Sequence, residues 1–342
     1  MSIIGRNHIV SGAVGNIKYD PTQTTTKEIR LGRRYTNFRC CLSVTLTAAG
    51  VAASDFVQAG IMALIRKMWI TIDSDSPIYD LSGTEIRNLQ IIETQAVPIG
   101  EETLVGNVTK TYKVCFTYRF DKANYAQKSA YGLDLSLVKN VGERAYQPFN
   151  ACLLNVDWGN INDIAKTSGG MTVTDANLSV EAEELFIPAV GLQQKIDRLV
   201  NVAFKRASVE KFTQSGTVEI EIPRHDRSVL LDVIIVKTQN GLVSNFDNND
   251  ARVTLKDVNY EPTNVPIHTL KQRVNEDRVF PLPDNVLILN QAGFGNVGNG
   301  VSDSVLSENL KLTLPVEVNN GEAGNQHEIH VLAIYTIAPK AF

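Results

Sequence analysis

TQTTTKEIRLGRR at Thr22–Arg34 and TQSGTVEIEIPRH at Thr213–His225 are the pair of segments that decides the fold. At an offset of 191 residues they share six identical positions of thirteen, where average composition gives roughly one by chance. Because the offset was chosen for its score, the identities alone do not establish a duplication. The spacing of the residues that follow adds independent support.

Both segments continue into the same alternation of apolar and outward-facing side chains. Without a gap, four apolar positions of the first run fall on four of the second, and each run then reaches a glycine, Gly50 or Gly241. A slip of one residue would turn every inward side chain outward, so the shared register predicts two copies of one β-domain. The matched pairs are Phe38/Val229, Cys40/Leu231, Leu42/Val233 and Val44/Ile235.

The two copies also end alike, at an offset of 151 residues, so the second copy is about 40 residues shorter. Loops absorb such differences at little entropic cost, and we expect the extra length of the first copy at 80–106 and 121–160. The matched end residues are Leu178, Val180 and Ala182 with Ile329, Val331 and Ala333.

Most of the remaining chain has the pattern of short strands with a period of two, separated by clusters of Gly, Asn, Asp and Ser. This pattern predicts an all-β sandwich or barrel and not alternating βαβ units. The further alternating segments are Tyr112–Phe120, Leu178–Ala182, Val229–Ile235, Leu310–Val316 and Ile329–Tyr335.

Two segments have helical signals instead. Apolar residues at helical spacing in Ala189–Ser208 predict a linker helix packed on the barrels, with a membrane-surface helix as the alternative. A second short helix is expected to start at Thr84. The expected organisation is an N-terminal arm over 1–21, a first β-domain over 22–188, a linker over 189–212 and a second β-domain over 213–342.

The composition is ordinary for a soluble protein with a core. Of the 342 residues 43% are hydrophobic and 20% charged, and the formal net charge is −4. No run of Lys or Arg is long enough for a basic nucleic-acid-binding arm, so we expect no direct sequence-specific contact with nucleic acid. The N-terminus is too polar for a signal peptide and no stretch approaches about 18 apolar residues, so we expect no leader and no membrane span.

The charge is nevertheless uneven, because residues 1–39 carry seven basic and two acidic side chains, a net charge of +5. One interpretation is a solvated strand surface. The other is a base that faces an anionic layer such as lipid head groups, for which Arg30, Arg33 and Arg34 are the candidate residues.

The four cysteines form no CxxC pair, and four in so long a chain make no disulfide framework. Neighbouring residues of a strand point to opposite faces, so Cys40 and Cys41 cannot share one core. We therefore expect Cys40, Cys41, Cys115 and Cys152 to be buried free thiols in a protein made in a reducing cytoplasm.

No catalytic or metal-binding constellation is recognisable. The spacing of His327 and His330 is not that of a cupin metal site, and we expect surface histidines near the chain end. The cluster 247–250 lacks the spaced carboxylates of a calcium loop, and the glycine-rich segment 293–300 opens into no helix. We predict no catalytic residue, no cofactor and no metal.

Two tandem all-β domains, each opening with Glu-Ile-x-Leu/Ile at Glu28 or Glu219, resemble the double jelly-roll major capsid proteins of tailless, membrane-containing icosahedral bacteriophages, in the adenovirus-like lineage. The resemblance covers Thr22 to Ile337. It rests on architecture and strand pattern and not on a short motif.

This resemblance implies an all-β fold of two tandem eight-stranded jelly rolls joined by a short linker helix. It implies a structural subunit, not an enzyme, that forms pseudo-hexagonal homotrimers tiling an icosahedral shell over an internal membrane. The implied partners are copies of itself, neighbouring trimers, vertex proteins and the viral membrane. The implied location is the virion, after synthesis in the host cytoplasm.

Three alternatives remain open at this stage. A double jelly-roll enzyme of the glycan amidase or bicupin type would need clustered acidic residues or metal-spaced histidines. A carbohydrate-binding sandwich pair would need exposed aromatic residues on one face, whereas aromatic residues are 7% of the chain. A spike or vertex protein of the same virus is the third.

Overall fold

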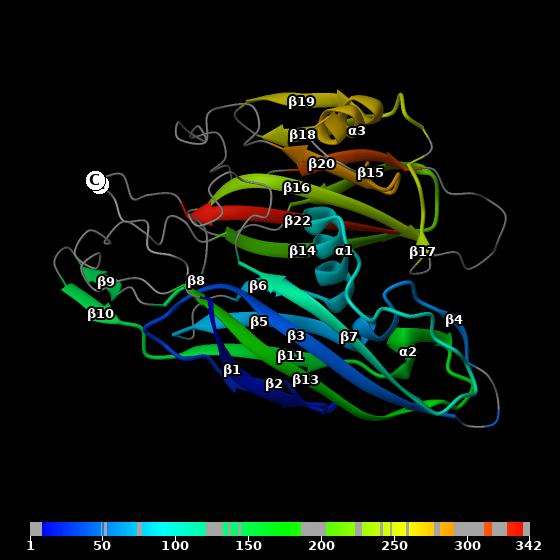
Figure 1. Cartoon of the computed structure of the whole chain (residues 1–342). Helices are drawn as coiled ribbons and strands as arrows, with labels where there is room; N and C mark the ends of the chain where they lie inside the picture. Colours follow the sequence, from blue (N-terminus) through cyan, green and yellow to red (C-terminus); the bar gives the residue numbers. More distant parts are fainter. Residues whose placement is uncertain are drawn as a thin grey trace. The chain divides into compact units, whose positions relative to one another are not determined.

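The computed structural model of the chain divides into two compact units, residues 1–203 with 339–342 and residues 204–338 (Figure 1). Within the residues that the structure describes, no helix combines the length and apolar composition that a bilayer crossing needs. The described residues are 9–48, 50, 53–73, 77–120, 133–135, 138–142, 145–185, 203–222, 228–239, 242–246, 248–257, 260–276, 281–290, 311–316 and 327–337.

The first unit is a sandwich of two antiparallel sheets. The strand order is β1-β13-β3-β7 in one sheet and β2-β11-β5-β6 in the other. With these eight strands lettered B to I in chain order, the sheets are B-I-D-G and C-H-E-F, the two interleaved Greek keys of a jelly roll. The bounds are β1 Ile9–Lys18, β2 Thr25–Glu28, β3 Arg34–Thr47, β5 Ile65–Ile72, β6 Ile78–Leu81, β7 Lys110–Arg119, β11 Cys152–Trp158 and β13 Thr172–Leu185.

The second unit repeats this strand order. Strands β14, β22, β16 and β20 are neighbours in that order, and β15-β21-β18-β19 form the other sheet, so the lettering is again B-I-D-G and C-H-E-F. The bounds are β14 Ala203–Phe212, β15 Gly216–Glu221, β16 Ser228–Gln239, β18 Arg252–Asp257, β19 Tyr260–Pro266, β20 Val286–Asn290, β21 Lys311–Val316 and β22 His327–Ile337.

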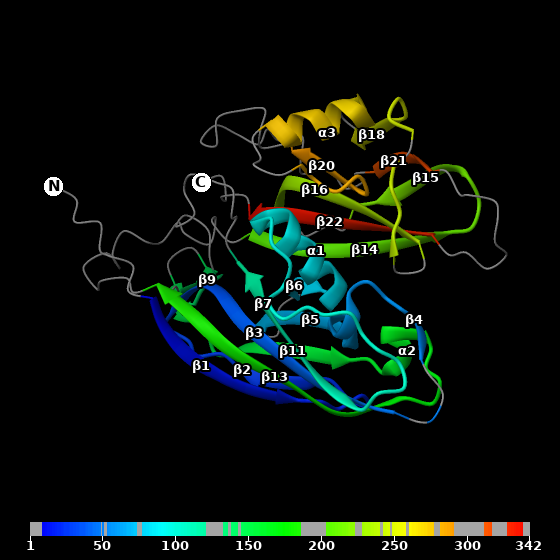
Figure 2. The same ribbon diagram turned by 45° about the vertical axis from the view of Figure 1, so that its right-hand side comes forward.

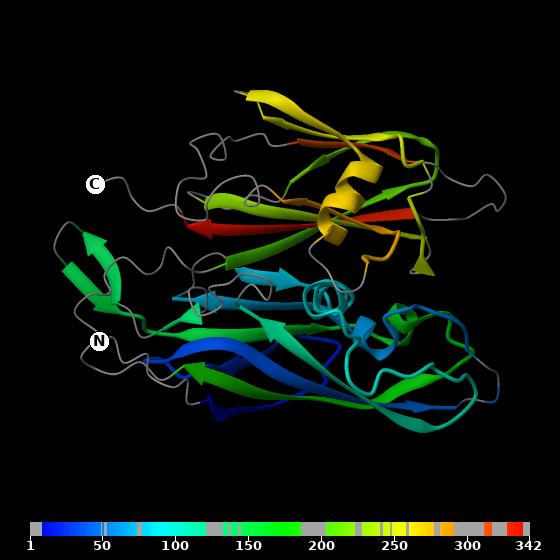
Figure 3. The same ribbon diagram turned by 45° about the horizontal axis from the view of Figure 1, so that its top comes forward.

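Each unit also carries a helix between strands F and G, the fifth and sixth of its eight lettered strands. These helices are α1 (Gly83–Thr94) in the first unit and α3 (Ile267–Glu276) in the second (Figure 3, cyan and yellow). The start of α1 is fixed by a capping box, in which Ser82 and Glu85 each accept a hydrogen bond from the other's backbone N–H. The expected helix start at Thr84 is therefore confirmed to within one residue.

The predicted duplication is confirmed by these topologies. The segment that starts at Thr22 supplies strands C and D of the first unit, and the segment that starts at Thr213 supplies strands C and D of the second. Some of the extra length of the first unit lies where it was expected. Residues 120–151 join β7 to β11, against 291–310 in the second unit, and 95–109 join α1 to β7, against 277–285.

The strand pairing corrects the match at the chain ends. Leu42 pairs with Leu178, whereas Val233, the counterpart of Leu42, pairs with Ala333. Strand pairing thus matches Leu178 to Ala333 and not to Ile329, four residues away. Because the difference is even, the inward and outward faces stay the same, which is why the sequence pattern alone could not detect it.

The expected alternation holds in β3, where Phe38, Cys40, Leu42 and Val44 are fully buried between the sheets of the first unit. In β16 it fails, because residues 233–236 are all buried. A strand covered on both faces has a continuous apolar run instead of an alternating one, as Val-Ile-Ile-Val here does.

The expected domain boundaries need two corrections. Residues 9–18 are not part of an arm, because β1 pairs with β13 along its length and forms the edge of a core sheet. Residues 203–208, expected as the end of a linker helix, belong to β14. The rest of the expected helix, 189–202, lies outside the described residues.

Short elements complete the units. They are β4 Ser54–Phe56, the 3-10 helix η1 Gly60–Leu64, β8 Leu133–Asp134, β9 Val138–Gly142, β10 Ala145–Pro148, α2 Ile161–Ile164, β12 Ala165–Thr167 and β17 Leu242–Val243.

Candidate functional site

Among the described residues, no group of three or more His, Cys, Asp or Glu side chains could hold a metal ion. The expectation of surface histidines near the chain end is wrong, because His327 and His330 in β22 are 1% and 7% exposed. His8, His225 and the glycine-rich segment 293–300 lie outside the described residues.

His327 has the surroundings of a core residue. Its ring stacks on Phe212 with centroids 5.4 Å apart, and neither ring nitrogen has a hydrogen-bond partner within the described part of the chain. Burial first, and the nearby Lys237 ammonium second, lower the pKa of His327. The neutral imidazole is therefore favoured, and no carboxylate among the described residues orients it for acid–base work.

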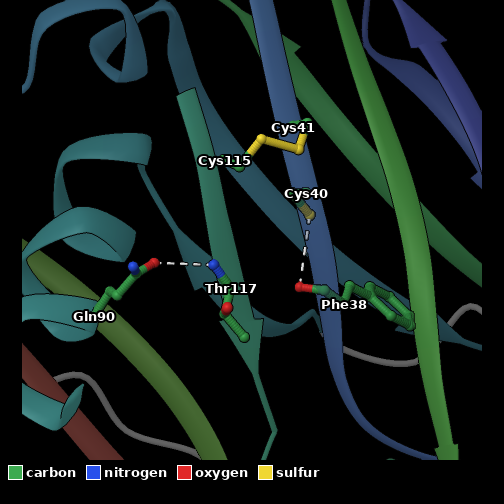
Figure 4. Close-up of a disulfide and its surroundings, with 6 residues drawn as sticks. All are labelled: Phe38, Cys40, Cys41, Gln90, Cys115 and Thr117. Atoms are coloured by element: carbon green, nitrogen blue, oxygen red, sulfur yellow. Dashed lines mark hydrogen bonds between the residues drawn. A yellow bond between two sulfur atoms is a disulfide. The ribbon is translucent and has the colours of Figure 1, made fainter. Parts of the chain in front are cut away.

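The cysteines divide into two kinds, which corrects the expectation of four free thiols. Cys41 and Cys115 are directly opposite each other on β3 and β7, with Cα atoms 4.1 Å apart, and they form a disulfide (Figure 4). Cys40 and Cys152 are free and buried as expected. Burial raises the pKa of Cys152 to about 12 and that of Cys40 further, so neither is a thiolate nucleophile.

The disulfide lies where α1 and the chain after it cover the open edge of β7. Gln90 of α1 accepts a hydrogen bond from the backbone N–H of Thr117 (Figure 4). Ile99 and Cys115 exchange two backbone hydrogen bonds of 2.9 and 2.8 Å. These contacts occupy backbone groups that an edge strand would otherwise offer to another chain.

The chain that connects α1 to β7 can be followed in cyan in Figure 2, and four of its large apolar side chains are exposed. We call Val97, Ile99, Val105 and Val108 the 97–108 surface; they are 56%, 78%, 50% and 42% exposed. Single exposed apolar residues are ordinary, whereas a group of them marks an interaction site.

The backbone that carries the 97–108 surface is held in place on both sides. Besides the Ile99 bridge, the backbone N–H of Val105 donates to the Tyr112 hydroxyl at 3.1 Å, and Leu104 is buried. Arg87 of α1 forms two hydrogen bonds of 2.7 and 2.6 Å with Glu101, and the Arg87 side chain is 7% exposed. The exposed side chains therefore project from an ordered segment.

The second unit has its own exposed apolar feature at the hairpin of β16 and β17. Leu242 and Val243 are 51% and 46% exposed and pair with Gln239 and Thr238. Successive residues of a strand point to opposite faces, so exposure of both means that β17 is open to solvent on both of its faces. We call these two residues the 242–243 tip.

The candidate basic residues lie together at one turn of the first unit. Arg30 and Arg33 are in the turn between β2 and β3, Arg34 begins β3, and the Tyr35 hydroxyl donates to the Arg30 carbonyl at 2.6 Å. Arg30 is exposed, while Arg33 is paired with Glu184 of β13 at 3.5 Å. Part of the positive charge expected there is thus balanced by β13.

By sequence, the chain matches no protein-family model and no curated protein. By structure, it is similar to the STIV major capsid protein, with a TM-score of 0.64, 13% identity and 98% and 100% of the two chains covered. It is also similar to a chain in the structure of Sulfolobus Turreted Icosahedral Virus, with a TM-score of 0.63 and 11% identity. The similarity covers 97% of this chain and 92% of the viral chain. The similarity to the Faustovirus major capsid protein has a TM-score of 0.55 and 8% identity. It covers 98% of this chain and 92% of the Faustovirus chain.

The strand order of both units and these likenesses over nearly the whole chain define a double jelly roll. The fold class expected from the sequence is thereby confirmed. The likeness at 8–13% identity concerns the fold.

Two features of the candidate site were missed at the sequence level. The Cys41–Cys115 disulfide depends on β3 and β7 being neighbours, although they are 74 residues apart in sequence. The 97–108 surface has no helical or strand period, so periodicity could not assign it. A usable signal was five large apolar residues in a connecting segment that also contains Pro98, Gly100 and Gly106.

Proposed function

We propose that the chain is the major coat protein of an icosahedral virus and that it works by assembly, not by catalysis. The observation that carries this proposal is the repeated strand order, B-I-D-G and C-H-E-F with a helix between F and G, in both units of one chain. Two of the similar solved structures are named as major capsid proteins.

In this proposal three chains close into a ring, so that six jelly rolls form a pseudo-hexagonal block. A closed ring uses heterologous contacts, in which one flank of each chain meets the other flank of the next. The duplication gives each chain two matching walls of such a block. The blocks then contact neighbouring trimers and vertex proteins in the virion shell, after synthesis in the host cytoplasm.

Light scattering on the purified protein tests this assembly. We expect a mass three times the 37.6 kDa of one chain, unchanged by metal chelators, because the contacts involve no metal. An obligate interface typically buries more than about 2,000 Å² in total, so the trimer should persist at micromolar concentration. A protein that stays monomeric there would contradict the proposal.

We also propose that the turn carrying Arg30, Arg33 and Arg34 faces the internal membrane. Exposed basic residues near an anionic lipid surface each contribute about 1 kcal/mol of binding. The Arg33–Glu184 pair reduces the expected contribution of Arg33, so Arg30 should contribute more than Arg33.

Flotation with anionic vesicles tests the membrane-facing turn. We expect the Arg30/Arg33/Arg34→Ala variant to float less than the wild type. The matched control is Arg66/Lys67/Lys110→Ala, which changes the charge equally at side chains that are 45%, 43% and 42% exposed. Equal flotation of wild type and the first variant would reject this role.

A further inference from the structure

The 97–108 surface combines exposed apolar side chains with an ordered backbone. Binding through an ordered segment costs little conformational entropy. When a partner covers exposed apolar side chains, their removal from water favours binding. A segment with no partner would lose nothing by carrying polar residues at these positions. The combination therefore marks a docking surface, and its chemistry calls for an apolar partner.

The 242–243 tip is an exposed apolar feature of the second unit, at the end strand of a sheet. It is open to solvent on both faces, both of its side chains are apolar, and β17 is the end strand of its sheet, paired on one side with β16 among the described strands. An uncovered apolar edge strand is a site of unwanted association unless a partner covers it. The tip thus needs an apolar surface.

The distribution of exposed apolar residues connects the two features. Seven large apolar side chains are exposed in the described part of the chain, and six of them belong to these two features. One feature lies on each unit. A ring built from heterologous contacts requires two different surfaces on every copy that meet each other, and these two are the apolar candidates in the described part of the chain.

We propose that the 97–108 surface of one copy receives the 242–243 tip of the next copy, so that the occupant of both surfaces is a second copy of this chain. The proposal rests on the assembly proposed above and names the side chains that form its contact. The first unit supplies the receiving surface and the second unit supplies the hairpin of β16 and β17.

Single charge substitutions test whether both surfaces matter. Ile99→Asp and Leu242→Asp should each weaken self-association by about tenfold or more, as expected for apolar anchors of an interface. Val209→Asp is the matched control, because Val209, at 39% exposed, is the seventh of the exposed large apolar residues in the described part of the chain and belongs to neither surface. Unchanged thermal unfolding of the dissociated variants would exclude misfolding as the cause.

Cysteine pairs test whether the two surfaces meet each other. Chains with Val105→Cys, a position of the 97–108 surface that is not paired with Cys115, mixed with chains with Leu242→Cys should give a two-chain adduct with a bis-maleimide, while either variant alone should not. Cys40 and Cys152 are buried, and Cys41 and Cys115 are bonded to each other, so the native cysteines stay silent. An adduct from one variant alone, or a double variant that links only within one chain, would overturn the proposed pairing.

The same samples separate the two proposals. A wild-type protein that is monomeric overturns both the coat function and this contact. A wild-type trimer that persists in Ile99→Asp and Leu242→Asp overturns the contact and leaves the coat function standing.

Discussion

At the scale of single residues, the alternation of side chains along a strand determines whether each side chain is buried or faces outward, and therefore which groups it contacts. Cys40 and Cys41 are neighbours in β3, yet Cys40 is fully buried between the sheets while Cys41 faces outward. The outward residue meets Cys115 across the strand pair and forms a disulfide, and the inward one remains a thiol. One step along the backbone thus separates a covalent link from a packing residue.

We expect Cys115→Ser to lower the free energy of unfolding by roughly 2–4 kcal/mol, because a disulfide restricts the unfolded chain and this one spans a long loop. The measurement is thermal unfolding with and without a thiol reductant. The reductant should destabilise the wild type and leave Cys115→Ser unaffected. Cys152→Ala is the control and should keep its sensitivity to reductant; a wild type indifferent to reductant would contradict the prediction.

His327 predicts a loss of stability on acidification. Burial and Lys237 lower the pKa of His327 below its ordinary value of 6.5, so the unfolded chain binds the proton more readily than the folded one. The stabilising contribution is therefore complete above pH 6.5 and falls as the pH falls below it. Glu328, whose pKa is lowered chiefly by its hydrogen bond with His330, loses its contribution only in a more acidic range.

The test compares thermal unfolding at about pH 8 and about pH 5, the range in which histidine titrates. His327→Phe, which can stack on Phe212 without a titratable nitrogen, should lose less stability over this interval than the wild type. His268→Phe is the control, because the His268 side chain is 54% exposed. Equal losses in wild type and His327→Phe would contradict the assignment.

At the scale of elements, α1 is placed by close packing of its first turn on η1. A Cβ atom at Gly83 would lie 1.9 Å from the carbonyl oxygen of Met62, so only glycine permits this approach. The placement matters because α1 positions Gln90 and Arg87, which hold the edge of β7 and the 97–108 surface.

Gly83→Ala should therefore destabilise the first unit by roughly 1–3 kcal/mol, the usual cost of overpacking. Gly216→Ala is the matched control, because a Cβ at Gly216 meets no atom within 4 Å. Chemical denaturation of both variants measures the difference. A Gly83→Ala protein as stable as Gly216→Ala would show that α1 can move without cost.

At the scale of the whole molecule, the repeated topology is the feature that supports the proposed assembly. Two units with one strand order can take equivalent places in a ring, although their loops differ in length. Because the proposed ring of three chains closes, the measured mass should reach a plateau at three chains with rising concentration. Continued growth in mass would indicate open, helical association instead.

The sequence by itself determined the class of the fold and the duplication. The period-two alternation of Phe38–Val44 and the gap-free register of this run with Val229–Ile235 are local properties that can be read from the sequence. The helix beginning near Thr84 was readable for the same reason, since a capping box involves residues three apart.

Only the tertiary structure decided which strands are neighbours. The pairing of Cys41 with Cys115, the match of Leu178 to Ala333, the place of β1 in a core sheet and the burial of His327 all depend on contacts between distant parts of the chain. Strand order is set by long-range packing, and an alternating pattern does not specify it, because strands that alternate share the same period whichever strand is their neighbour.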